Sequence, residues 1–123
     1  ELEFIKTHPK HILETGQSTN FKSRITKDYE NTYYFIVEFD EIESTHRLAE
    51  KIESEKIPNN TILLLRSDKQ SKGVGQHTNS FTSPFGNLYA TLIVNVKPDF
   101  NLTLTTLNFS LSVIDTLHHY LDE

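Results

Sequence analysis

Three short segments of the chain carry the residue pattern of β-strands. Residues 32–39 (TYYFIVEF) are aromatic and β-branched, and an acidic pair ends the run. Residues 61–65 (TILLL) are apolar throughout, which is typical of a strand covered on both faces of its sheet. Residues 87–96 (NLYATLIVNV) form a third apolar run, closed by Lys-Pro-Asp. The sequence therefore predicts three strands.

Two further segments have apolar residues at helical spacing. The first follows Ser44, whose hydroxyl can accept a hydrogen bond from an otherwise unpaired backbone N–H at the start of a helix. This helix is expected to end before Pro58. Its predicted apolar face consists of Leu48, Ala49 and Ile52. The second helix is predicted over residues 105–121, with one apolar stripe made of Leu107, Leu111, Ile114, Leu117 or His118, and Leu121.

The order of these segments predicts an α/β fold of the α+β type, in which a mixed β-sheet is flanked by helices. Residues 32–123 hold all of the predicted elements and are interpreted as one domain. Residues 1–31 are interpreted as an N-terminal extension of uncertain structure. Within that extension we expect a turn over residues 15–20, and either a short helix around His11 or a strand near Phe4.

The composition excludes several classes of function. A net charge of −5 argues against broad binding to nucleic acid or to an anionic membrane, because both need a basic surface. The absence of cysteine excludes disulfides, thiolate metal ligands and a cysteine nucleophile. No apolar run approaches the roughly 20 residues of a membrane span. We therefore expect a cytoplasmic protein without nucleic-acid or membrane partners, while an organellar location stays open.

A polar segment with two glycines, residues 69–86 (KQSKGVGQHTNSFTSPFG), separates the second and third predicted strands. We expect an open loop here, and loops of this length are usually functional or disordered. Gly73 and Gly75 allow backbone angles with positive φ and a close approach of a ligand to the main chain. Successive N–H groups in such a loop can hold an anion, but a plain turn uses the same glycines. From the residues alone, both interpretations stay open.

Several short motifs follow one another in a fixed order. The pair Ser44-Thr45 comes after the first strand, and a Gln-x-x-Gly-x-Gly loop runs from Gln70 to Gly75. An aromatic residue, a Ser-Pro-x-Gly turn and an Asn-Leu pair then lead into the third strand, namely Phe81, Ser83, Pro84, Gly86, Asn87 and Leu88. Together these motifs resemble the N-terminal half of the catalytic domain of the biotin protein ligase family, over roughly residues 33–121.

The resemblance implies a reaction, its cofactors and its partners. Ligases of this family join biotin to the α-phosphate of ATP and then pass the biotinyl group from biotinyl-AMP to a lysine of a carrier protein. By this resemblance, the chain uses biotin, ATP and Mg²⁺. The acceptor implied is a biotin carboxyl carrier protein or a carboxylase domain, and a homodimer or larger assembly is compatible with it.

The resemblance also assigns residues to two parts of a site. By analogy, Ser44, Thr45 and Gln70 hydrogen-bond the head group of biotin. The remaining residues of the implied biotin pocket are Gly73, Gly75, Asn87 and Leu88. The implied loop over the adenylate holds Lys72, Val74, Gln76, His77 and Phe81. No catalytic residue and no metal ligand of the protein is assigned.

Two departures from the family pattern weaken the expectation of catalysis. The family's loop usually carries basic residues that meet the carboxylate and the phosphates, and here the matching positions are Val74 and Gln76. His77 and the flanking Lys69 and Lys72 are the substitutes that the sequence offers. The family's Lys-Trp-Pro-Asn strand is not in the sequence, so we interpret the chain as the first half of a longer ligase, with that strand expected beyond its last residue.

Two other functions stay open at this point. One is a ligase-derived binding or assembly module that has lost the basic loop residues and the central lysine strand, and with them catalysis. The other is a relative of the octanoyl or lipoyl transferases on the same scaffold. Those relatives favour a loop of the Arg-Arg-x-Gly-Gly type, which this sequence does not have.

Overall fold

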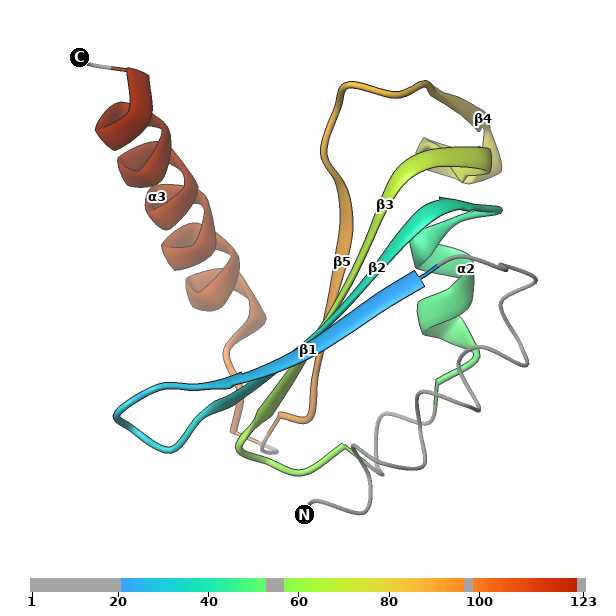
Figure 1. Cartoon of the computed structure of the whole chain (residues 1–123). Coiled ribbons are helices and arrows are strands. Elements are labelled where there is room, and N and C mark those ends of the chain that lie inside the picture. The colour runs from blue at the N-terminus through green and yellow to red at the C-terminus, as the bar shows by residue number, and fades with distance from the viewer. Residues whose placement is uncertain (1–20, 53–56, 97–98, 122–123) are drawn as a thin grey trace.

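The computed structural model describes residues 21–52, 57–96 and 99–121, which form a β-sheet and two α-helices (Figure 1). The strands are β1 (Phe21–Lys27), β2 (Tyr33–Ile42), β3 (Thr61–Val74), β4 (Ser80–Ser83) and β5 (Tyr89–Val94). The helices are α2 (Thr45–Glu50) and α3 (Leu102–Leu121), and the short 3₁₀ helix η2 covers Gln76–Thr78. The elements expected near Phe4, His11 and residues 15–20 lie outside the described residues.

The sheet is mixed. β2 and β3 run parallel, from Tyr33 beside Thr61 to Ile42 beside Gln70. β1 pairs antiparallel with β2, while β5 and β4 pair antiparallel with the first and second halves of β3. A parallel pair needs a crossover, and α2 lies in the connection between β2 and β3. The expected α+β fold with a mixed sheet is therefore confirmed.

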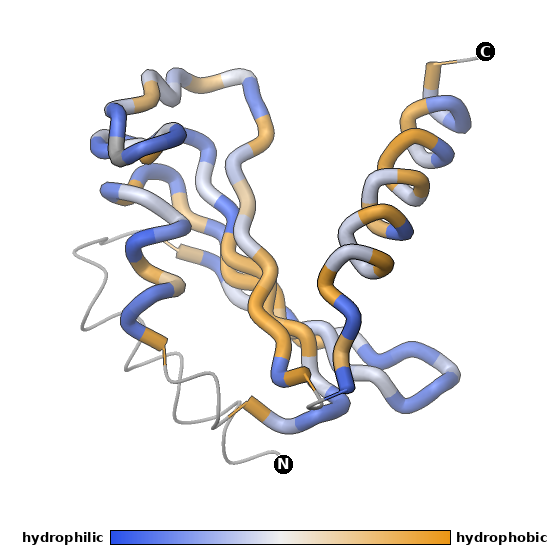
Figure 2. Tube along the Cα trace, turned by 180° about the vertical axis from the view of Figure 1, so that it is seen from behind, coloured by the Kyte–Doolittle hydropathy of each residue, from blue (hydrophilic) through white to orange (hydrophobic). Residues whose placement is uncertain are grey.

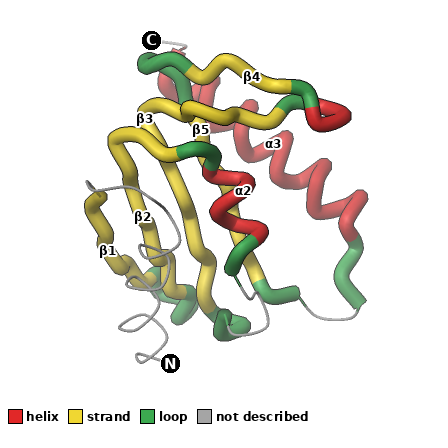
Figure 3. Tube along the Cα trace, turned by 90° about the vertical axis from the view of Figure 1, so that its right-hand side faces the viewer, coloured by secondary structure: helices red, strands yellow, loops and turns green. Residues whose placement is uncertain are grey.

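The hydrophobic core lies between α2 and one face of the sheet. Alternate residues of β2 and β3 are buried there, as the period of two along a strand requires. Figure 2 shows this hydrophobic stretch at the centre of the sheet. The core cluster consists of Phe35, Val37, Phe39, Ile42, Leu48, Ile57, Leu63 and Leu65. Figure 3 shows α2 on this face and α3 on the opposite side of the sheet.

β1, which the hydrophobic pattern did not predict, is joined to β2 by a turn built around Asp28. Its Oδ1 accepts hydrogen bonds from the backbone N–H groups of Glu30 and Thr32, both at 2.9 Å. Its Oδ2 accepts a hydrogen bond from the hydroxyl of Tyr34 at 3.0 Å. Every residue of β1 is exposed, and the strand contains three cations and no continuous apolar run, so the hydrophobic pattern does not reveal it. β1 thus brings the last part of the expected N-terminal extension into the sheet.

The prediction of an open loop between the second and third predicted strands is wrong for most of the residues concerned. β3 continues to Val74, and β4 pairs back on it, placing Gly73 opposite Phe81. Only residues 75–79 connect the two strands. The second half of β3 is polar and mostly reaches solvent, so the apolar pattern ends at residue 65 although the strand does not. The two glycines therefore belong to the tip of a β-hairpin.

Both predicted helices are present. Ser44 caps α2 as expected, because its Oγ accepts a hydrogen bond from the N–H of Arg47 at 3.3 Å. α2 ends at Glu50, and residues 53–56 of the longer helix that was predicted lie outside the described residues. α3 covers the predicted second helix, but none of its residues is buried. Within the described ranges, no helix is long and apolar enough to cross a membrane.

Candidate functional site

A cavity of about 400 Å³ lies where the start of α2, the end of β3 and the start of β5 meet. The parallel pairing of β2 with β3 creates this meeting point, because it carries the end of β2 to a position beside Gln70. The residues that line the cavity are Ser44, Thr45, His46, Gln70, Val74, Gly75, Phe81, Leu88, Tyr89, Ala90 and Thr91. Seven residues singled out from the sequence are among them, namely Ser44, Thr45, Gln70, Val74, Gly75, Phe81 and Leu88.

Gln70 connects the start of α2 to the β3–β4 hairpin. Its Oε1 accepts hydrogen bonds from the backbone N–H of Thr45 at 2.8 Å and from the hydroxyl of Thr45 at 3.2 Å. Its Nε2 donates to the hydroxyl of Ser83 at 3.1 Å, and Ser83 donates in turn to the carbonyl of Phe81 at 3.2 Å. A backbone N–H can only donate, so the side-chain oxygen must face Thr45 and the orientation of the amide is fixed. One N–H of the amide is not used by the bond to Ser83.

Thr91 extends this network across the cavity from β5. Its hydroxyl donates a hydrogen bond to the hydroxyl of Thr45 at 2.9 Å. Sequence reasoning did not select Thr91 or Ser83 as site residues. The alternation of side chains along β5 could have identified Thr91. Tyr89 and Ile93, two positions away on either side, share its face of the strand. A polar residue on an otherwise core-facing side of a strand is a reason to look for a ligand or a network.

Ser44 and Thr45 are both almost fully buried, with relative exposures of 3% and 4%. The cap of α2 uses a lone pair of the Ser44 oxygen and not its hydrogen. Ser44 therefore serves as a helix cap and still has a hydroxyl hydrogen to donate toward the cavity that it lines.

The two glycines of the hairpin have different roles. A Cβ on Gly73 would collide with the hydroxyl of Ser83 and would lie 2.5 Å from the carbonyl oxygen of Phe81. Gly73 is therefore required by the close approach of β3 and β4. At Gly75 the nearest atom to an added Cβ is the carbonyl oxygen of Asn79 at 3.3 Å, so this position is much less constrained. Gly75, and not Gly73, lines the cavity.

The model of one protein family, described as the biotin/lipoate A/B protein ligase family, matches residues 38–123. The chain belongs to this family. The match begins within β2 and includes every residue that lines the cavity. None of the curated proteins matches the chain. The family consists of ligases that act on biotin or lipoate, so the coarse expectation of a ligase-type domain is confirmed.

In this chain of the biotin/lipoate ligase family, Lys72 of the hairpin forms an ion pair with Glu43. Nζ of Lys72 lies 2.9 Å from Oε1 of Glu43, and the backbone N–H of Lys72 donates to the carbonyl of Glu43 at 2.7 Å. The hydrogen bond and charge of Lys72 hold the pKa of Glu43 below its ordinary value. Lys72 therefore fastens the hairpin to the end of β2.

The other residues assigned to an adenylate loop supply little charge. Val74 is half-buried in the cavity wall and offers only its hydrocarbon surface. Gln76 and His77 are exposed in η2, outside the residues that line the cavity. His77 has a φ of 54°, a left-handed conformation that is uncommon for a residue with a side chain.

Asn87 contacts the site indirectly. Its Nδ2 donates to the hydroxyl of Tyr89 at 3.3 Å, and that hydroxyl donates to the carbonyl of Pro84 at 2.9 Å. Tyr89 lines the cavity, so Asn87 positions the cavity wall without being part of it. Among the residues that the structure describes, no three His, Asp or Glu side chains gather closely enough to hold a metal ion.

Proposed function

We propose that the cavity beside Ser44 and Gln70 binds biotin, and that the chain provides this part of a biotin protein ligase. The observation that carries the proposal is that the Ser-Thr pair, Gln70 and Gly75 line one cavity although they come from different elements. The cavity volume of about 400 Å³ lies within the range of small-molecule sites. Membership in the ligase family supports an acyl substrate of this class.

The hydrogen-bonding groups of the cavity favour biotin over lipoate. The ureido ring of biotin presents one carbonyl acceptor and two N–H donors, whereas a dithiolane ring or an octanoyl chain presents none of comparable strength. Ser44 and Gln70 each have a hydrogen to donate toward a carbonyl, and Thr91 has lone pairs that can accept. An apolar acyl group would leave the unused hydrogens of Ser44 and Gln70 without an acceptor, and unpaired polar groups in a site discriminate against such a ligand.

In the proposed reaction, a carboxylate oxygen of biotin attacks the α-phosphorus of ATP, and pyrophosphate leaves. The amine of a carrier lysine then attacks the acyl carbon and AMP leaves, which forms an amide. The role of this chain is to bind and orient the acyl group with Ser44, Thr45, Gln70 and Thr91. The backbone of the hairpin tip at Gly75 flanks the end of the cavity at which the activated carboxylate is expected. ATP, Mg²⁺ and a carrier domain are part of this proposal.

A second candidate function is biotin binding without activation. The specific observation in its favour is the charge of the hairpin, where Val74 and Gln76 are neutral and Lys72 is paired with Glu43. Neutral donors bind an anion with roughly half the strength of charged ones. The two candidates agree on the pocket and differ in whether biotin-dependent exchange of pyrophosphate into ATP takes place.

The deciding experiment is isothermal titration calorimetry of the whole chain with biotin, lipoate and octanoate, each with and without ATP. We expect binding of biotin and little binding of the other two acids. The variant Thr91→Val keeps the shape of the side chain and removes its hydroxyl, and should weaken biotin about 3- to 10-fold. Thr26→Val, on exposed strand β1, is the matched control and should leave affinity unchanged. Binding of lipoate in preference to biotin would refute the proposed specificity.

A further inference from the structure

His46 lines the same cavity as Ser44 and Gln70, although sequence reasoning did not select it as a site residue. Of the eleven residues that line the cavity, only His46 and Tyr89 have titratable side chains, and only His46 can carry a positive charge. The hydroxyl of Tyr89 already donates to the carbonyl of Pro84 at 2.9 Å. His46 is therefore the residue of the described cavity wall that can meet an anion with a charge of its own.

Glu50 holds the ring of His46 from one turn further along α2. Nε2 of His46 lies 3.3 Å from Oε1 of Glu50, which is the neighbouring position four residues later on a helix surface. An ionised carboxylate can only accept a hydrogen bond, so Nε2 carries a hydrogen and Nδ1 is the ring nitrogen left for a ligand. Nδ1 has a lone pair when the ring is neutral and an N–H when the ring is protonated. Protonation therefore changes Nδ1 from an acceptor into a charged donor.

The residues of the cavity wall differ widely in exposure. Ser44 and Thr45 are almost fully buried, whereas the side chain of His46 is 61% exposed and Leu88 is 76% exposed. A bound acid places its uncharged ring beside the buried hydroxyls and its carboxylate toward solvent, because burying a charge costs far more than burying a neutral polar group. The carboxylate is therefore expected at the exposed rim of the cavity, to which His46 belongs.

Other charged residues at the start of α2 gather around Glu43. Three cations hold the pKa of Glu43 below its ordinary value, namely Lys72, which donates a hydrogen bond to it, Lys51 and Arg47. These four residues are not among those that line the cavity. In the described part of the chain, Glu50 is thus the charged side chain that lies against His46.

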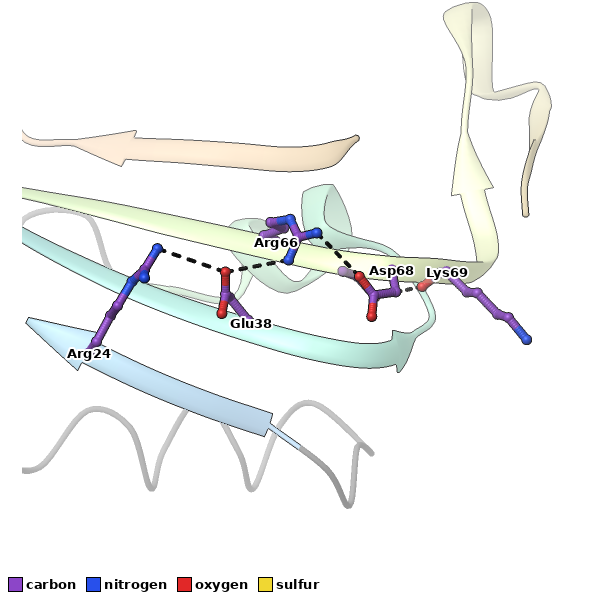
Figure 4. Close-up of polar contacts among 6 residues, drawn as sticks. Arg24, Glu38, Arg66, Asp68 and Lys69 are labelled. Carbon is purple, nitrogen blue, oxygen red and sulfur yellow. Dashed lines mark hydrogen bonds and ion pairs between the residues drawn. The ribbon is translucent and has the colours of Figure 1, made fainter. Parts of the chain in front are cut away.

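A second group of charged residues pairs on the other face of the sheet. Arg66 lies 3.4 Å from Glu38 and 3.3 Å from Asp68, and Arg24 lies 3.9 Å from Glu38 (Figure 4). Glu38 and Arg66 alternate along β2 and β3 with buried core residues and therefore lie on the face away from α2. This network of ion pairs does not face His46.

We propose that His46 binds the carboxylate of the acyl ligand, with Nδ1 of the protonated ring donating to a carboxylate oxygen. The inference rests on the proposed function and adds to it a charged contact that the neutral Val74 and Gln76 do not provide. Glu50 keeps the other ring nitrogen, so the ring bridges Glu50 and the ligand. A hydrogen bond between charged groups is roughly twice as strong as one between neutral groups. His46 thereby distinguishes an acid from a neutral ligand with the same head group.

This contact makes the affinity for an acid depend on pH. Histidine side chains change charge between about pH 5 and pH 8. An aliphatic carboxyl group has an ordinary pKa near about 4.3 and stays ionised over that range. At low pH the protonated ring attracts the carboxylate, and at high pH the lone pair of Nδ1 faces the lone pairs of the carboxylate and the attraction is lost. The acid should therefore bind more tightly as the pH falls.

Calorimetry of the whole chain with biotin and with biotinol, the alcohol that has the same head group and no charge, tests the proposal at about pH 5.5 and pH 8. Biotin should bind about 3- to 10-fold more tightly at the lower pH, a modest gain because solvent at the rim weakens a charged contact. The affinity for biotinol should not change with pH.

Three variants locate the pH dependence. His46→Gln cannot be protonated and should bind biotin at both pH values as weakly as the wild type does at the higher one. His46→Lys keeps its charge and should bind biotin tightly at both. His118→Gln removes an exposed histidine of α3, outside the cavity lining, and should keep the wild-type pH dependence. Melting temperatures without ligand should be similar in all variants, because exposed ion pairs contribute little to stability.

The neutral ligand separates a failure of this inference from a failure of the proposed function. If biotinol binds but the affinity for biotin does not change with pH, the pocket stands and the role of His46 is overturned. The same conclusion follows if His46→Gln keeps the pH dependence. If neither biotin nor biotinol binds, the proposed function is refuted and this inference with it.

Discussion

The side-chain oxygen of Gln70 accepts two hydrogen bonds from Thr45, one from its backbone N–H at 2.8 Å and one from its hydroxyl at 3.2 Å. Both lone pairs of that oxygen are therefore occupied by the start of α2. Gln70 meets a ligand only through the remaining N–H of its amide. The residue thus joins two functions, since it fixes the position of α2 on β3 and leaves one donor for the cavity.

Replacing Gln70 by alanine should reduce both stability and binding. The N–H of Thr45 would lose its partner while Thr45 is only 4% exposed, which costs about 1–3 kcal/mol of unfolding free energy. Urea denaturation followed by circular dichroism measures this loss. Gln76→Ala, at an exposed position outside the cavity lining, is the control and should change stability by less than about 0.5 kcal/mol. Similar losses in both variants would show that the Gln70 network does not hold α2.

The glycines of the hairpin should respond unequally to substitution by alanine. Gly73→Ala places a methyl group against the Ser83 hydroxyl and the Phe81 carbonyl, so β3 and β4 must separate, at a cost of about 1–3 kcal/mol. Gly75→Ala meets its nearest atom at 3.3 Å with a φ of −93°, and should change stability by less than about 1 kcal/mol. Denaturant midpoints of the two variants provide the comparison. A larger loss for Gly75→Ala would contradict the hairpin geometry.

The ion pair of Glu43 with Lys72 should make stability depend on pH. The pKa of Glu43 is lowered in the folded state because Lys72 donates a hydrogen bond to the carboxylate. A carboxyl group whose pKa is lowered in the folded state stabilises the fold at pH values above its pKa in the unfolded chain, which is near 4.5 here. This contribution is lost as the pH falls through the lower pKa of the folded state. Melting temperatures should therefore fall below about pH 4.5. In Lys72→Met the fall in melting temperature on acidification should be smaller than in the wild type.

The control for this prediction is Lys69→Met, which removes the same charge from an exposed position on the same strand. It should leave the acid-induced decrease in melting temperature intact. Part of the decrease should persist in both lysine variants, because the backbone hydrogen bond from Thr32 lowers the pKa of Asp28 as well. Identical profiles for wild type and Lys72→Met would mean that the pair contributes nothing to stability.

Restoring positive charge to the hairpin should strengthen the binding of an activated acyl group. The double variant Val74→Arg with Gln76→Arg is expected to bind a non-hydrolysable biotinyl-adenylate analogue at least about 10-fold more tightly, because charged donors are stronger toward phosphate. Calorimetry at two salt concentrations should show that the gain is screened. Ser71→Arg with Thr82→Arg adds the same charge at exposed positions outside the cavity lining. An equal gain in this control would mean that net charge, and not placement, is responsible.

The central part of the fold followed from sequence because its strands carry strong apolar signals. β2 and the first half of β3 are buried on alternate positions, and α2 is marked by the Ser44 cap. β1 and the second half of β3 were missed because solvent-facing strands carry charges and hydroxyls like those of loops. β4 was missed because it is short and gains its stability from pairing with β3, which no local pattern reports.

The candidate site was predictable only in part. The resemblance to the biotin protein ligase family assigned Ser44, Thr45, Gln70 and Gly75 to one site, and they line one cavity. The pairing of Lys72 with Glu43 depends on positions 29 residues apart that the parallel strands bring together, so sequence spacing could not reveal it. The position of Thr91 in the cavity wall depends likewise on the register of β5 against β3, in which Thr91 lies opposite Leu65. Residues whose roles arise from strand register are the ones that reading along the chain overlooks.

The exposed strand β1 has one more consequence, for solubility. Within the described sheet, β1 pairs only with β2, so its far side offers backbone N–H and C=O groups to any extended segment that approaches. Three cations, Lys22, Arg24 and Lys27, are distributed along its seven residues. Two such strands repel each other when they meet side by side, which disfavours the edge-to-edge growth that leads to fibrils. The same charges that make this strand look like a loop in the sequence are therefore expected to disfavour edge-to-edge pairing between copies of β1.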